Sequence, residues 1–190
     1  EERNNLKIYR VNQSTYKAGF VGQSISFIKY AIFVIRKVKN ENYDLVFASS
    51  SRFMTAFLAA YLKKKKKSKL YLDIRDIFVD TINELFSGPI LFILKKVFVP
   101  IENYTINNAD AINLVSRGFE KYFINKFPNK KFSFISNGID QVFLESKFNN
   151  TFNKRRKLIY AGNIGYGQGL EKIIPKLSQK ISKNWDILII

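Results

Sequence analysis

Four glycines lie within eight residues near the C-terminal end of the sequence, at positions 162, 165, 167 and 169. The apolar run at 158–161 before them predicts a buried strand, and apolar residues at helical spacing begin at Leu170. A strand, a glycine loop and a helix in this order aim backbone N–H groups and a helix N-terminus at a phosphate. The spacing alone leaves a glycine-rich turn without a ligand equally open. Phosphate binding would also need a cation, and Gln168 is uncharged.

A second group with chemical potential is the sequence Asp73-Ile-Arg75-Asp76. Two carboxylates that flank an arginine can orient a sugar hydroxyl, act as a base or bind a metal. The alternative is structural, with an aspartate that caps the following helix and Arg75 as its partner. The motif alone does not decide between these two interpretations.

The composition excludes several classes of site. The 190 residues contain no Cys and no His, which excludes disulfides, thiolate or His-ligated zinc and a Ser–His–Asp triad, and we predict no metal site. The net charge of +17 fits an anionic partner such as nucleic acid, a membrane or a polyanionic substrate. No apolar run reaches the length of about 18 residues that a spanning helix needs.

The elements that must position these residues alternate along the chain. Short apolar runs predict buried strands at 43–48, 70–74, 111–115 and 132–135, with helices between them. Such alternation is typical of an α/β fold with a parallel sheet and right-handed crossovers. We predict a doubly wound, Rossmann-like N-terminal domain at 1–147, a polar linker at 148–156, and the first strand, loop, helix and strand of a second such domain at 157–190.

Ligands of open parallel sheets bind beyond the carboxyl ends of the strands, so the loops after the predicted strands are the expected place for a site. Besides Asp73, Arg75 and Asp76, the polar residues of those loops in the first domain are Ser50, Ser51, Arg52, Ser116, Asn137 and Asp140. If the two sheets face each other, these residues and the glycine loop line one cleft.

Two lysine-bearing stretches need a separate interpretation. The segment 89–101 is apolar with two lysines, which fits either a membrane surface or, as we prefer, a core helix whose lysines extend outward. The five consecutive lysines at 63–67 are expected to complement a helix C-terminus and to lie in water.

The ordered motifs resemble a bacterial glycosyltransferase of family 4, which has the two-domain GT-B architecture. The stretches that carry the resemblance are 43–55, 70–80, 109–116, 135–140 and 160–170. Their order and spacing match along nearly the whole chain, and the branch that they resemble most is the amino-sugar (fucosamine-like) transferases of surface-polysaccharide synthesis.

The resemblance implies a retaining transfer of a sugar from a nucleotide donor, expected to be UDP-linked, to a glycan or lipid-linked acceptor, without a metal or other cofactor. The first domain would hold the acceptor, with Asp73, Arg75 and Asp76 as catalytic candidates. The second would bind the donor diphosphate at Gly162, Asn163, Gly165, Gly167, Gln168 and Gly169. The implied location is the cytoplasm, at the inner face of the cell membrane, with anionic lipid as a peripheral partner and no nucleic acid.

The sequence also departs from the family pattern. Arg75 stands where many members have a His, and Gln168 stands where a Lys often precedes the last loop glycine. The acidic Glu-x7-Glu motif of the donor domain would lie beyond Ile190, and the first strand and glycine loop of the acceptor domain are missing or curtailed. We therefore expect a fragment that has no transferase activity by itself.

Two other functions stay open at this point. The net charge fits a non-catalytic basic binding module, although the lysines are dispersed and no helix-turn-helix, aromatic RNA-binding pair or zinc spacing is present. A different nucleotide-dependent enzyme on a doubly wound fold is also compatible, because a fold does not fix a function.

Overall fold

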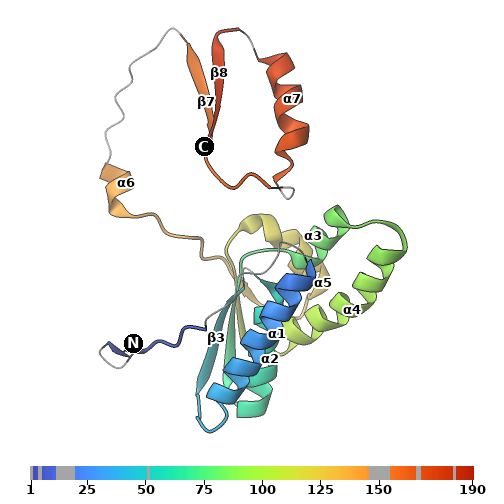
Figure 1. Ribbon diagram of the computed structural model, residues 1–190. Coiled ribbons are helices and arrows are strands. Elements are labelled where there is room, and N and C mark those ends of the chain that lie inside the picture. The colour runs from blue at the N-terminus through green and yellow to red at the C-terminus, as the bar shows by residue number, and fades with distance from the viewer. Residues whose placement is uncertain are drawn as a thin grey trace. The chain divides into compact units, whose positions relative to one another are not determined.

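The computed structural model describes residues 2–3, 6–11, 20–50, 52–145, 155–165, 168–181 and 183–190 of the chain. The chain divides into two compact units between Asn137 and Gly138 (Figure 1). Most of the predicted linker, residues 148–154, lies outside the described residues, so the domain boundary at 147 stays a prediction.

The first unit contains a parallel sheet and the helices that connect its strands (Figure 1). The strands of the sheet are β3 (Leu45–Ser50), β4 (Lys69–Ile74), β5 (Ala111–Leu114) and β6 (Phe132–Ser133). The helices are α1 (Phe20–Lys37), α2 (Phe53–Lys66), α3 (Phe78–Leu85), α4 (Gly88–Asn107), the short 3₁₀ helix η1 (Arg117–Phe119) and α5 (Glu120–Lys126). An antiparallel pair, β1 (Glu2–Arg3) and β2 (Leu6–Lys7), precedes α1.

The order of the strands explains where the helices lie. The strands follow one another as β3-β4-β5-β6, all parallel, so every connection advances in the same direction. Right-handed crossovers that all advance one way place their helices on one face of the sheet. Accordingly, α2, α4 and α5 contribute to a single core. The predicted α/β fold with a parallel sheet is confirmed and is compatible with a Rossmann-like fold, but the described helices do not cover the second face that a doubly wound sheet also buries.

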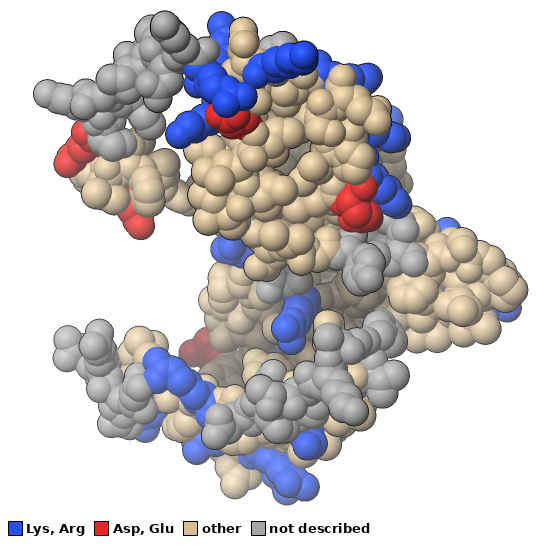
Figure 2. Space-filling view, turned by 45° about the horizontal axis from the view of Figure 1, so that its top comes forward, with Lys and Arg blue, Asp and Glu red and all other residues tan. Residues whose placement is uncertain are grey.

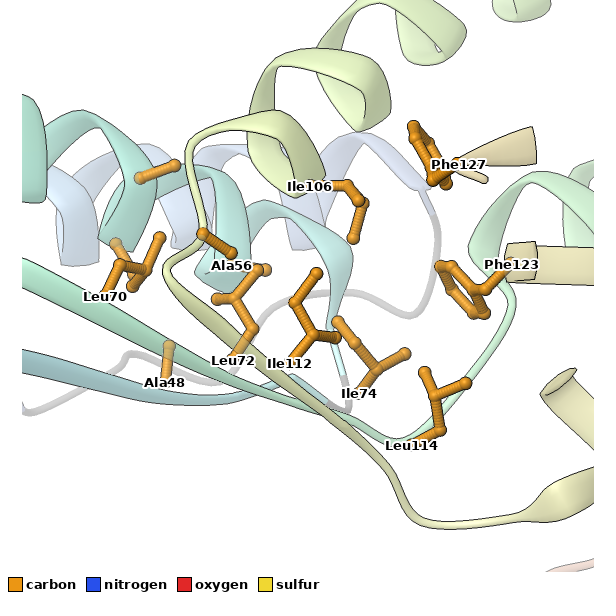
Figure 3. Packing of buried hydrophobic residues seen from close by; sticks show 13 residues of the cluster. Ala48, Ala56, Leu70, Leu72, Ile74, Ile106, Ile112, Leu114, Phe123 and Phe127 are labelled. Carbon is orange, nitrogen blue, oxygen red and sulfur yellow. The ribbon is translucent and has the colours of Figure 1, made fainter. Parts of the chain in front are cut away.

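The core lies between this face and the helices (Figure 3). Alternate residues of β4, Leu70, Leu72 and Ile74, are buried in it, and Leu114 of β5 is completely buried. Small residues of α2 allow the helix to approach the sheet closely; these are Ala56, Ala59 and Ala60. Burying each leucine contributes roughly 1.5–3 kcal/mol, so this cluster supplies much of the stability of the first unit.

The opposite face of the sheet is largely exposed at β3, although Asp73 of β4 and Asn113 of β5 on the same face are buried. Phe47 of β3 is 61% exposed, and its ring stacks on Tyr71 of β4 with the ring centroids 5.5 Å apart. The prediction of a buried strand at 43–48 is therefore wrong for four of its six residues, which are exposed. Strand alternation buries Ala48 and Ser50 on the helix-covered face and leaves Leu45 and Phe47 on the other.

Helix α4 corrects a second prediction. The core-helix interpretation of 89–101 is wrong for the first half of α4, where at least half of the surface of Ile90, Phe92, Ile93 and Val97 is exposed. The buried residues of α4 are in its last turns and are Glu102, Thr105 and Ile106. The helix thus packs on the core with its C-terminal part only.

The second unit contains α6 (Gln141–Glu145), β7 (Arg156–Tyr160), α7 (Leu170–Lys180) and β8 (Trp185–Ile189). The two strands are parallel, with Leu158 opposite Ile187, so the predicted order of strand, loop, helix and strand is confirmed. The first strand is not buried as predicted, because Ile159 is more than half exposed in this two-stranded pair.

Candidate functional site

The register of the sheet places three polar side chains side by side near the carboxyl ends of the strands. Ser49 of β3 lies opposite Asp73 of β4, and Asp73 lies opposite Asn113 of β5. The Ser49 hydroxyl donates to Asp73 Oδ2 over 3.1 Å, and Asn113 Nδ2 donates to Asp73 Oδ1 over 2.8 Å. Arg75 Nε donates to the same Oδ2 over 3.0 Å and to Ser49 Oγ over 2.7 Å. We call Ser49, Asp73, Arg75 and Asn113 the Asp73 network.

Asn113 is 2% exposed and uses its full hydrogen-bonding capacity. Its second amide hydrogen bonds the carbonyl of Ile135 over 2.9 Å, and its Oδ1 accepts from the Ile135 N–H over 2.7 Å and from the Ser133 hydroxyl over 3.2 Å. Asn113 therefore links the Asp73 carboxylate to the chain that follows β6. The sequence analysis did not select Asn113 or Ser49. The signal for Asn113 was an amide within an apolar strand, since a buried amide requires partners.

Burial alone would raise the pKa of the Asp73 carboxyl. Hydrogen bonds from Asn113, Ser49 and Arg75, together with the positive charge of Arg75, outweigh that effect and lower the pKa below its ordinary value. Asp73 is thus an anion at neutral pH, and its two oxygens already accept three hydrogen bonds. A carboxylate in this state is a weak base, and its main effect is to fix the orientation of Arg75.

The guanidinium of Arg75 is held at one end and open at the other. Only Nε bonds the network, the side chain is 42% exposed, and the two terminal nitrogens have no partner within the described part of the chain. Such a fork matches the geometry of a phosphate or carboxylate. Asp76 is exposed and accepts the N–H of Ile77, the residue that directly precedes α3, so this bond is local and does not cap a helical N–H group of α3.

Asp76 also lines a small cavity together with Ser50. Strand alternation places Ser50 on the helix-covered face of the sheet, opposite to the face that carries Ser49. The cavity has a volume of about 20 Å³, enough for about one water molecule and far too small for a sugar. Its aromatic wall is formed by Phe53 and Phe78, which stack at 4.7 Å, and no sequence argument identified these rings.

Glu102 of α4 is a buried carboxylate that the sequence analysis also missed. It is 2% exposed, lines the same cavity, and accepts hydrogen bonds from the Tyr122 hydroxyl and the Lys126 ammonium. Burial first, and then the charge and hydrogen bond of Glu102, strongly raise the pKa of Tyr122. The ion pair with Lys126 and the bond from Tyr122 account for this carboxylate without a ligand.

Among the described residues, Ser116, Arg52 and Asn137 make no side-chain bond to the Asp73 network. Ser116 accepts the N–H of Gly118 at the start of η1 and is therefore a cap. Arg52, Asn137 and Asp140 are exposed, and Ser51 lies outside the described residues.

The three described glycines of the loop after β7 each have a local structural feature. A Cβ at Gly162 would lie 3.1 Å from the Tyr160 hydroxyl, and a Cβ at Gly165 would lie 3.0 Å from the Gln168 side chain. Gly169 has a φ of 62°, in the left-handed region, and directly precedes α7. Gly167 lies outside the described residues. The Tyr160 hydroxyl donates to the carbonyl of Asn163, which braces the loop.

The first turn of α7 resembles a simple anion site only in part. The N–H groups of Leu170 and Glu171 have no partner among the described residues, as is usual at a helix N-terminus. The carboxylate of Glu171 opposes an anion there, and Lys172 is the nearest cation. A cleft between this loop and the Asp73 network would require residues of both units, so this cleft stays a prediction.

The face shown in Figure 2 carries no continuous basic surface of the kind that binds a polyanion. Lys and Arg lie there in several separate groups among neutral residues (Figure 2). Within the part of the chain that the structure describes, no three acidic residues come together as a metal site. None of the described helices has the length and apolar character needed to cross a membrane.

Comparison with known proteins adds no further information about this site. None of the protein-family models matches the sequence. A search of curated proteins finds no match either. The assignment of a function must therefore rest on the site itself and on the motifs of the sequence.

Proposed function

We propose that this chain is part of a GT-B glycosyltransferase that transfers a sugar from a nucleotide-sugar donor, UDP-linked, to a glycan or lipid-linked acceptor of a surface polysaccharide. The observation that carries the proposal is the guanidinium of Arg75. It is fixed by Asp73 and Ser49 at the carboxyl edge of a parallel sheet, and its two terminal nitrogens have no partner among the described residues. This edge is where open α/β folds bind their ligands.

The residues of the network then have separate roles. Arg75 binds a phosphate group of the substrate, because a guanidinium fork recognises two phosphate oxygens at once. Asp73 is a positioning residue, since its oxygens are occupied by Arg75 and two neutral donors. Asp76 is the exposed carboxylate at this edge and the better candidate for contact with a sugar hydroxyl.

The loop after β7 supports the donor side of the proposal. Its order of strand, glycine loop and helix, and the unpartnered N–H groups of Leu170 and Glu171, suit the diphosphate of a nucleotide sugar. Gln168 is exposed and supplies no charge, so a cation from another part of the protein would have to complete this subsite.

The first half of α4 supports a peripheral contact with the membrane that carries a lipid-linked acceptor. Its exposed residues Phe92 and Ile93 are each 60% exposed, and Lys96 lies 4.5 Å from the centre of the Phe92 ring. Apolar side chains beside lysines favour the surface of an anionic bilayer. Co-sedimentation with phosphatidylglycerol vesicles should fall in a Phe92→Ser, Ile93→Ser variant and stay unchanged in Val142→Ser, a control at another exposed apolar residue. Equal binding of both variants would contradict this contact.

The function itself is tested by a transfer assay with a panel of UDP-, GDP- and dTDP-sugars and lipid-linked acceptors. The assay uses the 190-residue chain and the longest natural protein that contains its sequence. We expect transfer by the longer protein and none by the chain alone. Arg75→Gln should reduce kcat/KM by about 100-fold, as removal of one charged transition-state contact does, with Arg75→Lys between the two.

The control is Arg117→Gln, which removes another arginine that pairs with an acidic residue, Glu120, and is more exposed than Arg75 (76% against 42% of the side chain). It should retain full turnover. Absence of transfer from every donor would overturn the proposed function, and full turnover in Arg75→Gln would overturn the role of the network.

A further inference from the structure

The amino-terminal edge of the sheet carries polar residues that the proposed transfer does not use. An open pocket of about 280 Å³ lies there, between the end of α2, the start of β4 and the turn after α4. β4 has six residues, which at roughly 3.3 Å per residue separates this pocket from Arg75 by about 20 Å. The pocket is therefore distinct from the Asp73 network. Its charged residues are Lys63, Lys64, Lys67, Lys69 and Asp110.

Several lysines near this edge have partners that explain them fully. Lys66 donates to the carbonyls of Lys39 and Glu41, as expected for a cation at the end of a helix. Lys63 and Lys69 each lie 3.4 Å from the Asp110 carboxylate. These three lysines indicate no ligand by themselves.

Lys64 and Lys67 are different, because neither has an acceptor among the described residues. Both are exposed, and the Lys64 ammonium lies 6.0 Å from the centre of the Tyr104 ring. Four ammonium groups against the single carboxylate of Asp110 leave the pocket with an excess of three positive charges. A concave surface with this excess attracts anions.

Ser68 supplies an independent observation. It lines the same pocket, is only 6% exposed, and is the one described residue whose buried side-chain oxygen has no hydrogen-bond partner. Buried hydroxyls are nearly always bonded, so an unpaired one needs an explanation. An anion in the pocket that Ser68 lines would supply the acceptor that this hydroxyl lacks.

We propose that this pocket binds a phosphate group, with Lys64 and Lys67 as the cations and the Ser68 hydroxyl as a hydrogen-bond donor. A phosphate monoester or diester fits, because its oxygens accept from several ammonium groups and a hydroxyl at once. Asp110 keeps Lys63 and Lys69 at the wall and limits the net charge. The site does not depend on the proposed transfer reaction.

The test is a titration of the ¹⁵N-labelled chain with glycerol 3-phosphate, with sodium chloride at equal ionic strength as the blank. We expect saturable shifts of the Ser68 and Lys69 amide signals that chloride does not produce. Lys67→Gln and Lys64→Gln should each weaken binding by about fivefold to tenfold, because each removes a charge-assisted hydrogen bond. Lys65→Gln removes the same charge outside the pocket and should change the affinity less than twofold.

Ser68→Ala separates a ligand group from a packing defect. We expect weaker phosphate binding together with an unchanged or higher melting temperature, because the variant removes an unpaired hydroxyl. Unchanged affinity in Ser68→Ala, or an equal loss in Lys65→Gln and Lys67→Gln, would overturn the proposal. So would the absence of saturation.

A second arm identifies the source of the phosphate. Vesicles of phosphatidic acid and of phosphatidylglycerol are compared with neutral phosphatidylcholine vesicles. If the natural ligand is a lipid headgroup, Lys67→Gln should weaken binding to the anionic vesicles. Soluble glycerol 3-phosphate should then compete with the vesicles for the pocket. If the natural ligand is a soluble phosphorylated molecule, Lys67→Gln should lose affinity for glycerol 3-phosphate in the titration, while its binding to vesicles stays unchanged. Vesicle binding that falls in Lys67→Gln without competition by glycerol 3-phosphate would contradict the site.

Discussion

Replacement of Asp73 tests whether the Asp73 network holds the carboxyl edge of the sheet together. The bond from Asn113 to Asp73 is buried and charge-assisted, which is worth about 1.5–3 kcal/mol. The bonds from Ser49 and Arg75 are partly exposed to solvent and are each worth about 0–1 kcal/mol. Asp73→Ala should therefore lower the free energy of unfolding by about 1.5–5 kcal/mol.

The isosteric variant Asp73→Asn should cost less. Its amide oxygen can still accept from Asn113, while the charge assistance is lost and the new NH₂ group faces Arg75. We expect a loss of about 1–2 kcal/mol, measured by urea denaturation at pH 7. Asp76→Asn is the matched control, because this exposed carboxylate accepts the neighbouring Ile77 N–H and no other bond from the described residues, and it should change stability by less than about 0.5 kcal/mol.

The same variant predicts a change in pH dependence. The pKa of Asp73 is lowered in the folded chain, so its contribution is fully present above the unfolded pKa of about 3.9 and is lost as the pH falls through the folded pKa. The stability of the original chain and of Asp73→Asn should therefore converge in acid. If Asp73→Asn loses no more stability than Asp76→Asn, or if the difference is the same at pH 3 and pH 7, the network does not stabilise this edge.

Three further substitutions test other parts of the structure by urea denaturation. Leu72→Ala should cost about 2–5 kcal/mol, because the side chain is completely buried in the core, and a smaller loss would contradict this packing. Glu102→Ala should cost about 3–5 kcal/mol by leaving Lys126 without its buried partner, and near-neutral behaviour would show that solvent reaches this pair. Gly169→Ala should destabilise the second unit by about 1 kcal/mol, because Gly169 has a positive φ. The control Gly138→Ala should not destabilise it, because φ is ordinary there and an added Cβ meets no atom within 4 Å. Equal effects of the two substitutions would exclude the left-handed conformation at residue 169.

The sequence predicted the type and order of the elements well, since this information is local. Apolar runs at 70–74 and 111–115 mark strands because a buried strand must be apolar on at least one face. Which face is covered depends on the direction of the crossovers, and this direction is not written in any single segment. For this reason the burial of Phe47 was predicted wrongly. Ile93 was predicted wrongly for a different reason, because only the C-terminal part of α4 packs on the core.

The candidate site was predicted only in part for the same reason. Asp73 and Arg75 are close in sequence and were identified together, whereas Ser49 and Asn113 reach Asp73 only through strand register. Ser50 was chosen in place of Ser49 because the loop pattern does not show which of two adjacent serines shares a face with Asp73. A shift of one residue in register would exchange their positions, so the choice requires the paired sheet.

The two ends of β4 use aspartate in different ways, which bears on where a ligand can bind. At the carboxyl end, Asp73 accepts from three donors, and the terminal nitrogens of Arg75 have no partner within the described residues, so a single anion meets a fixed fork. At the amino end, Asp110 accepts the N–H of Leu70 and shares its charge between Lys63 and Lys69. Its cations are flexible lysines that act as point charges. The first arrangement selects the orientation of a ligand and the second selects only its charge. We therefore expect chemistry at the carboxyl end, where orientation matters, and unreactive binding of a phosphate at the amino end.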